Sequence, residues 1–153
     1  MTSPLPILRA GLTALVLLAP LSARSQDAEG APVAEAAPDA LSIELNGAAT
    51  EGGSCRLTFL VENGLAADLA ALSLETVVLS AEGRVEQVTL FDFGALPMGR
   101  PRVRQFDLAG LGCDAIGQVL INGVTACEGP GVGPEACMAG LALSSRAGIE
   151  LIG

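Results

Sequence analysis

Carboxylates are the side chains of this sequence best able to carry acid–base chemistry, because the chain has no histidine and no lysine to act as a base. The candidate pairs are Asp107 with Asp114 and Glu128 with Glu135. Paired carboxylates in a cleft catalyse glycoside hydrolysis, usually beside aromatic sugar platforms. The chain has no Trp or Tyr, so we expect no catalytic residue and keep a carboxylate-dependent, glycan-active enzyme as the alternative function.

The same carboxylates could also bind calcium, since Ca²⁺ prefers several oxygen ligands on one loop. No spaced Asp-x-Asp-x-Asp-Gly run is present. The four cysteines are widely spaced, unlike the paired Cys-x-x-Cys arrangement of a zinc site. We therefore expect neither a bound metal nor a cofactor.

The four cysteines are Cys55, Cys113, Cys127 and Cys137. An even number of cysteines in an exported chain indicates disulfides, and four cysteines allow three pairings. We favour Cys127 with Cys137, which closes a short Gly/Pro loop, and Cys55 with Cys113, which ties one strand to a distant segment. The pattern favours an oxidising compartment.

Three arginines crowd into five residues at Arg100, Arg102 and Arg104. On a strand their spacing places all three on one face, where they could bind an acidic envelope protein, a carboxylated glycan or a phosphate headgroup. The bland alternative is that they pair with neighbouring carboxylates or protect a sheet edge from aggregation. These three residues are the predicted partner-binding site.

The first 25 residues have the pattern of a secretory signal peptide: a short segment with Arg9, an apolar run, and small residues before Gln26. The run is too short to span a bilayer, so we expect no stable membrane insertion after cleavage. Residues 26–40 are Ala-, Pro- and acid-rich and predict a disordered linker. The folded domain should comprise residues 41–153, in the periplasm or secreted.

The chain is acidic, with a formal net charge of −9 and all 17 acidic residues after the predicted cleavage site. Such a surface repels nucleic-acid phosphates, and with four Phe as the only aromatic residues it offers few stacking groups. Nucleic-acid binding is therefore excluded as a function class. The sequence leaves the oligomeric state open.

Apolar residues alternate with polar ones along Cys55–Asn63, which predicts a half-buried strand closed by Asn63-Gly64. Similar segments at 41–46, 72–81, 84–93, 101–108, 116–126 and 141–152 are separated by turn signals. Asn46-Gly47 should end the first strand. The alternation changes phase within 84–93, which a bulge or a strand covered on both faces would explain. Pro101 indicates an edge strand. The pattern predicts an all-β, antiparallel, immunoglobulin-like β-sandwich of about seven short strands with two disulfides.

Three segments resemble a family of small secreted proteins of Gram-negative bacteria known as Tat pathway signal sequence domain proteins: Cys55-Arg56-Leu57-Thr58-Phe59 with Asn63, Arg102 to Leu108, and Val119-Leu120-Ile121-Asn122 through Cys127. The resemblance covers residues 41–153 and supports the compartment and the fold. It implies no activity. Because no twin-arginine pair precedes the apolar run, export by the general secretory route is equally compatible with the sequence.

These observations favour an exported, non-catalytic domain that works by binding or structural association in the bacterial envelope. The expected partner is an envelope protein or an acidic glycan. A third alternative is an accessory or inhibitor protein of an exported enzyme.

Overall fold

A computed structural model describes residues 40–153 and shows an all-β domain, as predicted. The predicted signal peptide (1–25) and the predicted linker, apart from Ala40, lie outside the described residues. The elements are β1 (Leu41–Glu51), β2 (Ser54–Asn63), β3 (Ala71–Leu79), β4 (Val85–Asp92), β5 (Arg102–Leu108), η1 (Cys113–Ala115), β6 (Gln118–Glu128), α1 (Pro134–Ala139), β7 (Leu141–Ser145) and β8 (Glu150–Ile152).

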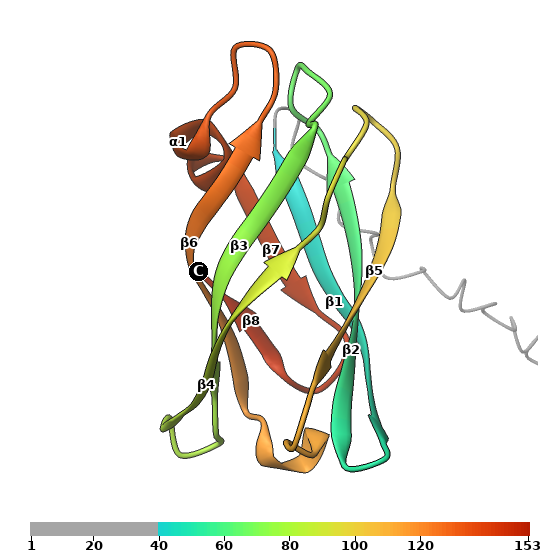
Figure 1. The fold of residues 1–153 in the computed structure, drawn as a ribbon, viewed down its shortest axis with the longest axis vertical. Helices are drawn as coiled ribbons and strands as arrows, with labels where there is room; N and C mark the ends of the chain where they lie inside the picture. The colour runs from blue at the N-terminus through green and yellow to red at the C-terminus, as the bar shows by residue number, and fades with distance from the viewer. Residues whose placement is uncertain (1–39) are drawn as a thin grey trace, which may run out of the picture. The chain divides into compact units, whose positions relative to one another are not determined.

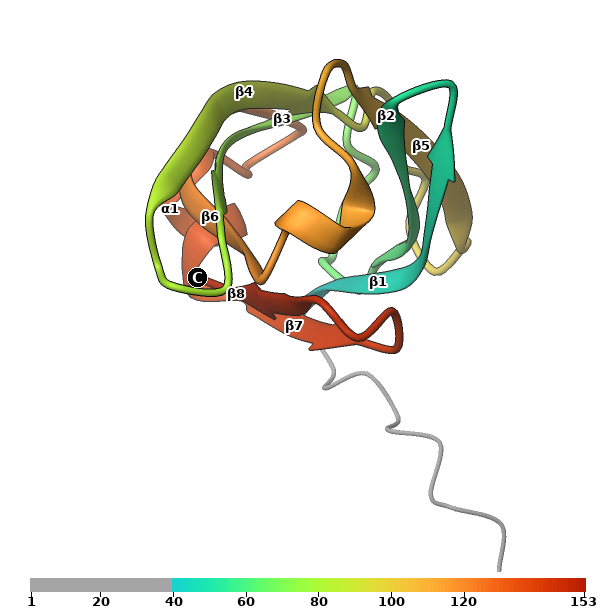
Figure 2. The same ribbon diagram turned by 90° about the horizontal axis from the view of Figure 1, so that it is seen from below.

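The strands form two four-stranded sheets, with the orders β5-β2-β1-β7 and β4-β3-β6-β8. The two sheets face each other as in a sandwich (Figures 1 and 2). Four strands are therefore sheet edges: β5 and β7 in the first sheet, β4 and β8 in the second. The edge position that Pro101 predicts for residues 102–108 is confirmed.

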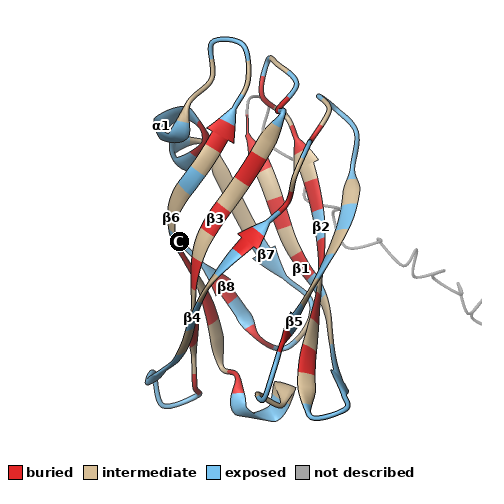
Figure 3. Cartoon of the chain, viewed as in Figure 1, coloured by how far each residue is buried: buried red, intermediate tan, exposed pale blue. Residues whose placement is uncertain are grey.

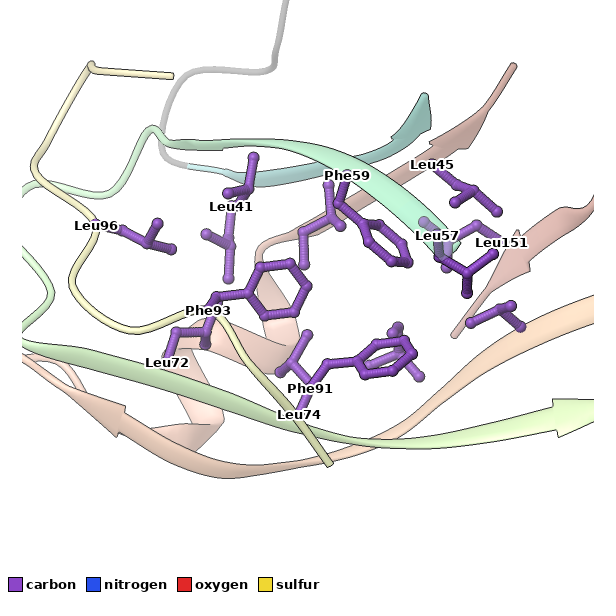
Figure 4. Close-up of a cluster of buried hydrophobic side chains, with 14 of the residues drawn as sticks. Leu41, Leu45, Leu57, Phe59, Leu72, Leu74, Phe91, Phe93, Leu96 and Leu151 are labelled. Carbon is purple, nitrogen blue, oxygen red and sulfur yellow. The ribbon is translucent and has the colours of Figure 1, made fainter. Parts of the chain in front are cut away.

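The core fills the space between the sheets, because one side of each central strand carries mainly apolar residues. In β2 the apolar ones are Cys55, Leu57, Phe59 and Val61, all fully buried. Asn63 of β2 and Thr76 of β3 are buried polar residues on the same inward sides. Buried residues alternate with partly exposed ones along β1, β2 and β3 (Figure 3). Phe59 from the first sheet contacts Phe91 of the second, with the ring centroids 5.6 Å apart (Figure 4).

The prediction of purely antiparallel sheets is wrong: β7 pairs with β1 and β8 pairs with β6 in parallel. The direction follows from where each edge strand begins. The Leu41 amide donates to the Gly140 carbonyl, so β7 starts beside the start of β1. The Glu150 amide donates to the Gly117 carbonyl, so β8 starts beside the start of β6. Hydrophobic alternation carries no information on this direction.

The predicted end of the first strand at Asn46-Gly47 is also wrong, because β1 continues to Glu51. The register shifts between Leu45 and Gly47, so this dipeptide forms a β-bulge. The hairpin turn lies instead at Gly52-Gly53, where both residues have positive φ, 56° and 81°. Glycine adopts this conformation without the steric penalty that a Cβ brings.

Both predicted disulfides are present, and no free cysteine remains in the described residues. Cys55–Cys113 joins β2 to η1, with the two Cα atoms 4.8 Å apart. Cys127–Cys137 joins β6 to α1, with a Cα–Cα distance of 6.4 Å. The Gly/Pro stretch 128–140, predicted as a loop, contains the six-residue helix α1, and Pro134 in its first turn is the signal for it.

Candidate functional site

The four candidate catalytic carboxylates lie on different elements. Asp107 belongs to β5 and Asp114 to η1, whereas Glu128 ends β6 and Glu135 lies in α1. Because β6 runs from η1 to α1, the two predicted pairs sit at opposite ends of that strand (Figure 1). An open depression beside α1 is lined by residues 133–136 and contains one carboxylate, Glu135. The described residues contain no cluster of three or more His, Cys, Asp or Glu able to hold a metal ion.

Asp107 is part of an ion-pair network on the outer face of the first sheet. Arg56 donates to both oxygens of Asp107, at 2.8 and 3.1 Å, and also pairs with Glu51 at 2.6 Å. The hydrogen bond from Arg56 lowers the pKa of Asp107 below its ordinary value. A carboxylate held ionised in this way is unsuited to act as a general acid.

The same face contains a second pair, Arg146 with Glu44, joined at 2.9 Å. Hydrogen bonds from Asn46 and Arg146 lower the pKa of Glu44. Both arginines of this face thus pair with carboxylates, while Glu62, on the same side of β2 as Arg56, has no ion-pair partner among the described residues.

The predicted partner-binding arginines do not form one row. Arg100 is exposed and precedes β5, whereas Arg102 and Arg104 belong to β5. Their register partners in β2 are Val61 and Phe59, which are buried, so the two arginines lie on the side of β5 that faces the other sheet.

Arg104 bridges the edges of the two sheets. Its guanidinium donates to the backbone carbonyl of Phe93 at 2.7 Å and to that of Ala95 at 3.3 Å, both just beyond β4. Arg102 donates only to the adjacent Pro101 carbonyl. Within residues 40–153 none of the three arginines is within ion-pair distance of a carboxylate. Arg104 therefore has a structural contact, and Arg100 and Arg102 keep their cationic groups available to an anion.

The outer face of the second sheet carries an apolar row that crosses all four strands. Val88 of β4 is in register with Val77 of β3, Val77 with Leu120 of β6, and Leu120 with Ile152 of β8. Val88 and Ile152 are 59% and 38% exposed, and Leu90, next on the same side of β4, is 59% exposed. We call Val77, Val88, Leu90, Leu120 and Ile152 the apolar face.

All charged side chains on the strands around the apolar face are acidic, and β3, β4, β6 and β8 contain no basic residue. Glu75, Asp92 and Glu150 accept hydrogen bonds from the neutral side chains of Asn122, Ser73 and Gln118, respectively. No cation neutralises these carboxylates among the described residues. This surface thus combines exposed apolar groups with carboxylates that no cation pairs. On the outer face of the first sheet, by contrast, two arginines pair with carboxylates, and the large exposed apolar residues among those described are one register pair, Leu60 and Val103.

The apolar face is not among the predictions from the sequence, although the sequence contains two signals for it. Val119-Leu120-Ile121 is apolar on both sides of a strand, and residues 84–93 place Val88 and Leu90 on the side opposite Phe91. The structure confirms a bulge at this hairpin, where the register shifts between Val78 and Leu79. A strand covered on both faces and a strand with apolar side chains exposed to solvent give the same sequence pattern. Only the sheet order reveals that the outer face of the second sheet is uncovered.

No protein-family model and no curated protein matches the chain. Among solved structures, the fold is similar to that of IrmA from Escherichia coli, with a TM-score of 0.54 and 13% sequence identity. The match covers 68% of this chain and 90% of that chain. At this identity the likeness bears on the fold alone, where it agrees with an all-β, two-sheet architecture. The resemblance to the Tat pathway signal sequence domain proteins stays a prediction.

The described part of the chain has no helix with the length and hydrophobicity needed to cross a membrane.

Proposed function

We propose that this chain is an exported, non-catalytic binding domain and that it docks an envelope protein on the apolar face. The observation that carries the proposal is the row from Val88 to Ile152, which exposes apolar side chains across the full width of one sheet. Contiguous apolar patches on a protein surface mark interaction sites when polar groups surround them.

Export is the second part of the proposal, and two features support it. The N-terminal sequence has the pattern of a signal peptide, and the domain has two disulfides and no free cysteine in its described part. We also assign the two-sheet fold to the immunoglobulin-like sandwiches, on the basis of its strand number and its two facing sheets. The periplasm or the external medium is the proposed location.

The difference between the two outer faces supports the choice of surface. On the first sheet, Arg56 and Arg146 pair with carboxylates of neighbouring strands, and the large exposed apolar side chains among the described residues are only the register pair Leu60 and Val103. The second sheet has exposed valine and leucine side chains beside carboxylates that lack a cation. Burial of the apolar groups against a protein would stabilise the complex by about 25 cal/mol for each Å² removed from water.

An acidic glycan is the second candidate ligand and would require a different site. Its carboxylates would bind Arg100 and Arg102, whose guanidinium groups pair with no carboxylate in the described residues. An accessory or inhibitor role is the same docking activity with an exported enzyme as the partner. A carboxylate-dependent enzyme is less well supported, since the candidate acids are dispersed and Asp107 is bound by Arg56.

The test compares two valines with matched surroundings. Val88 and Val103 are both 59% exposed, and both lie on edge strands, one in each sheet. The mature, disulfide-bonded protein is immobilised, exposed to a periplasmic extract, and each captured protein is identified, purified and titrated back. The proposal predicts that Val88→Lys abolishes binding of the purified partner and that Val103→Lys retains it. Equal affinity of the two variants would contradict the choice of surface.

A further inference from the structure

The four sheet edges differ in how they are protected against pairing with another strand. Natural proteins block edges with short strands, proline, bulges or inward-facing charges. β7 and β8 have only five and three residues. β5 follows Pro101 and has two inward-facing arginines, Arg102 and Arg104. Three of the four edges are thus protected.

β4 has none of these protections over most of its length. It contains eight residues without proline or a basic side chain, and its inward side carries the neutral residues Gln87 and Thr89 before Phe91. Its bulge lies at the very start, opposite Leu79. Val88 and Leu90 project outward and are exposed. A long edge with exposed apolar residues is suited to accept a further strand.

The backbone groups available at this edge follow from the hydrogen-bond pattern. The Phe93 amide donates to the Leu72 carbonyl of the neighbouring strand. In an antiparallel ladder, residues alternate between bonding the neighbour and facing away from it. The amide and carbonyl groups of Val88, Leu90 and Asp92 therefore face away from β3, at the free edge of the sheet.

We propose that β4 is a strand-addition site, at which an extended segment of a partner protein pairs antiparallel with β4 and continues the apolar face by one strand. This inference rests on the proposed function and specifies how the partner binds. The outward side chains along the regular part of β4 are Val88, Leu90 and Asp92, and they are preceded by the exposed residue Glu86, the extra residue of the bulge. The complementary segment thus has the pattern basic-x-apolar-x-apolar-x-basic, with the basic residues opposite Glu86 and Asp92.

The charge pattern selects a basic partner over a second copy of this chain. If two copies of β4 paired antiparallel with Val88 opposite Leu90, Glu86 would lie opposite Asp92 in both halves of the dimer. Like charges directly opposite each other destabilise a strand pair. Residues at the x positions would lie on the side of Arg102 and Arg104, which disfavours further basic residues there and favours small polar ones.

The probe that tests the inference is the blocked peptide acetyl-Lys-Thr-Val-Thr-Val-Thr-Lys-amide, titrated into the isotope-labelled, mature, disulfide-bonded protein. In antiparallel pairing the peptide's valine amides donate to β4, whereas its threonine amides face solvent. A peptide N-methylated at both valines should bind at least about tenfold more weakly, since it loses two hydrogen bonds. The matched peptide N-methylated at two threonines should keep its affinity within about threefold, and the amide signals of Val88 and Leu90 should shift.

Each other outcome has a defined meaning. Equal affinity of the two methylated peptides, with binding lost in Val88→Lys, would overturn strand addition while leaving the apolar face as the docking surface. Binding that Val88→Lys does not weaken would overturn both proposals. A concentration-dependent dimer of the protein alone, abolished by Val88→Lys, would replace the basic partner with a second copy.

Discussion

Removal of the Cys55–Cys113 disulfide should destabilise the domain more than removal of Cys127–Cys137. The first disulfide joins residues 58 positions apart, and the second joins residues ten positions apart. A cross-link restricts the unfolded chain more when it closes a longer loop. The chain-entropy relation gives about 4 kcal/mol for the longer loop and about 3 kcal/mol for the shorter one.

The perturbation is a pair of double variants, Cys55→Ala/Cys113→Ala and Cys127→Ala/Cys137→Ala. Cys55, Cys127 and Cys137 are buried and Cys113 is partly buried, so the Cys127/Cys137 variant loses at least as much buried sulfur, and the cavity cost acts against the expected order. A domain of this size has a total unfolding free energy of about 5–15 kcal/mol. Loss of the longer cross-link should therefore leave it marginally folded at 37 °C.

The assay is guanidinium unfolding followed by far-UV circular dichroism, because the chain has no Trp or Tyr to report by fluorescence. The expected order of unfolding free energies is wild type, then the Cys127/Cys137 variant, then the Cys55/Cys113 variant, with about 1–2 kcal/mol between the two variants. A Cys127/Cys137 variant that is as unstable as the other, or less stable, would refute the loop-length argument.

Three further predictions concern single side chains. Arg104→Met should reduce the unfolding free energy by about 1–2 kcal/mol, because it loses the two hydrogen bonds to backbone carbonyls across the sheets. Arg102→Met should leave the unfolding free energy nearly unchanged, and chemical denaturation of both variants measures the difference. Asn63 is fully buried and its side chain bonds three backbone groups, so Asn63→Ala should cost about 2–4 kcal/mol in the same experiment, and a loss under about 1 kcal/mol would contradict this role. Because Arg56 lowers the pKa of Asp107 in the folded state, the contribution of Asp107 is present above the ordinary carboxyl pKa and is lost as the pH falls through the lowered value. The melting temperature of Asp107→Asn should therefore fall less steeply than that of the wild type as the pH drops below about 4. An equally steep fall in the two proteins would contradict this prediction.

Local sequence signals predict where most of the strands lie and favour the two disulfides that form. Alternation along Cys55–Asn63 reports burial on one side of β2, and Pro101 reports the edge position of β5, because proline cannot donate to a central ladder. Both depend on neighbouring residues or on a single residue type, so they can be read without knowledge of the fold.

Features that depend on sheet order could not be predicted in this way. The parallel direction of β7 and β8 depends on which end of the sandwich the preceding segment reaches. The apolar face depends on four strands being in register, and the inward direction of Arg104 depends on its pairing with Phe59. Each arises from contacts between distant segments, and the spacing of residues along one strand carries no information about such contacts.

The central claim, that the apolar face is the docking surface, is tested most directly by methyl NMR of the mature protein with labelled Val, Leu and Ile. Titration with the purified partner should shift and broaden the methyl signals of Val77, Val88 and Leu120. The methyl signals of Leu60 and Val103, which are register partners and partly exposed on the first sheet, should stay unchanged. Shifts confined to Leu60 and Val103 would contradict the account and place the partner on the opposite sheet.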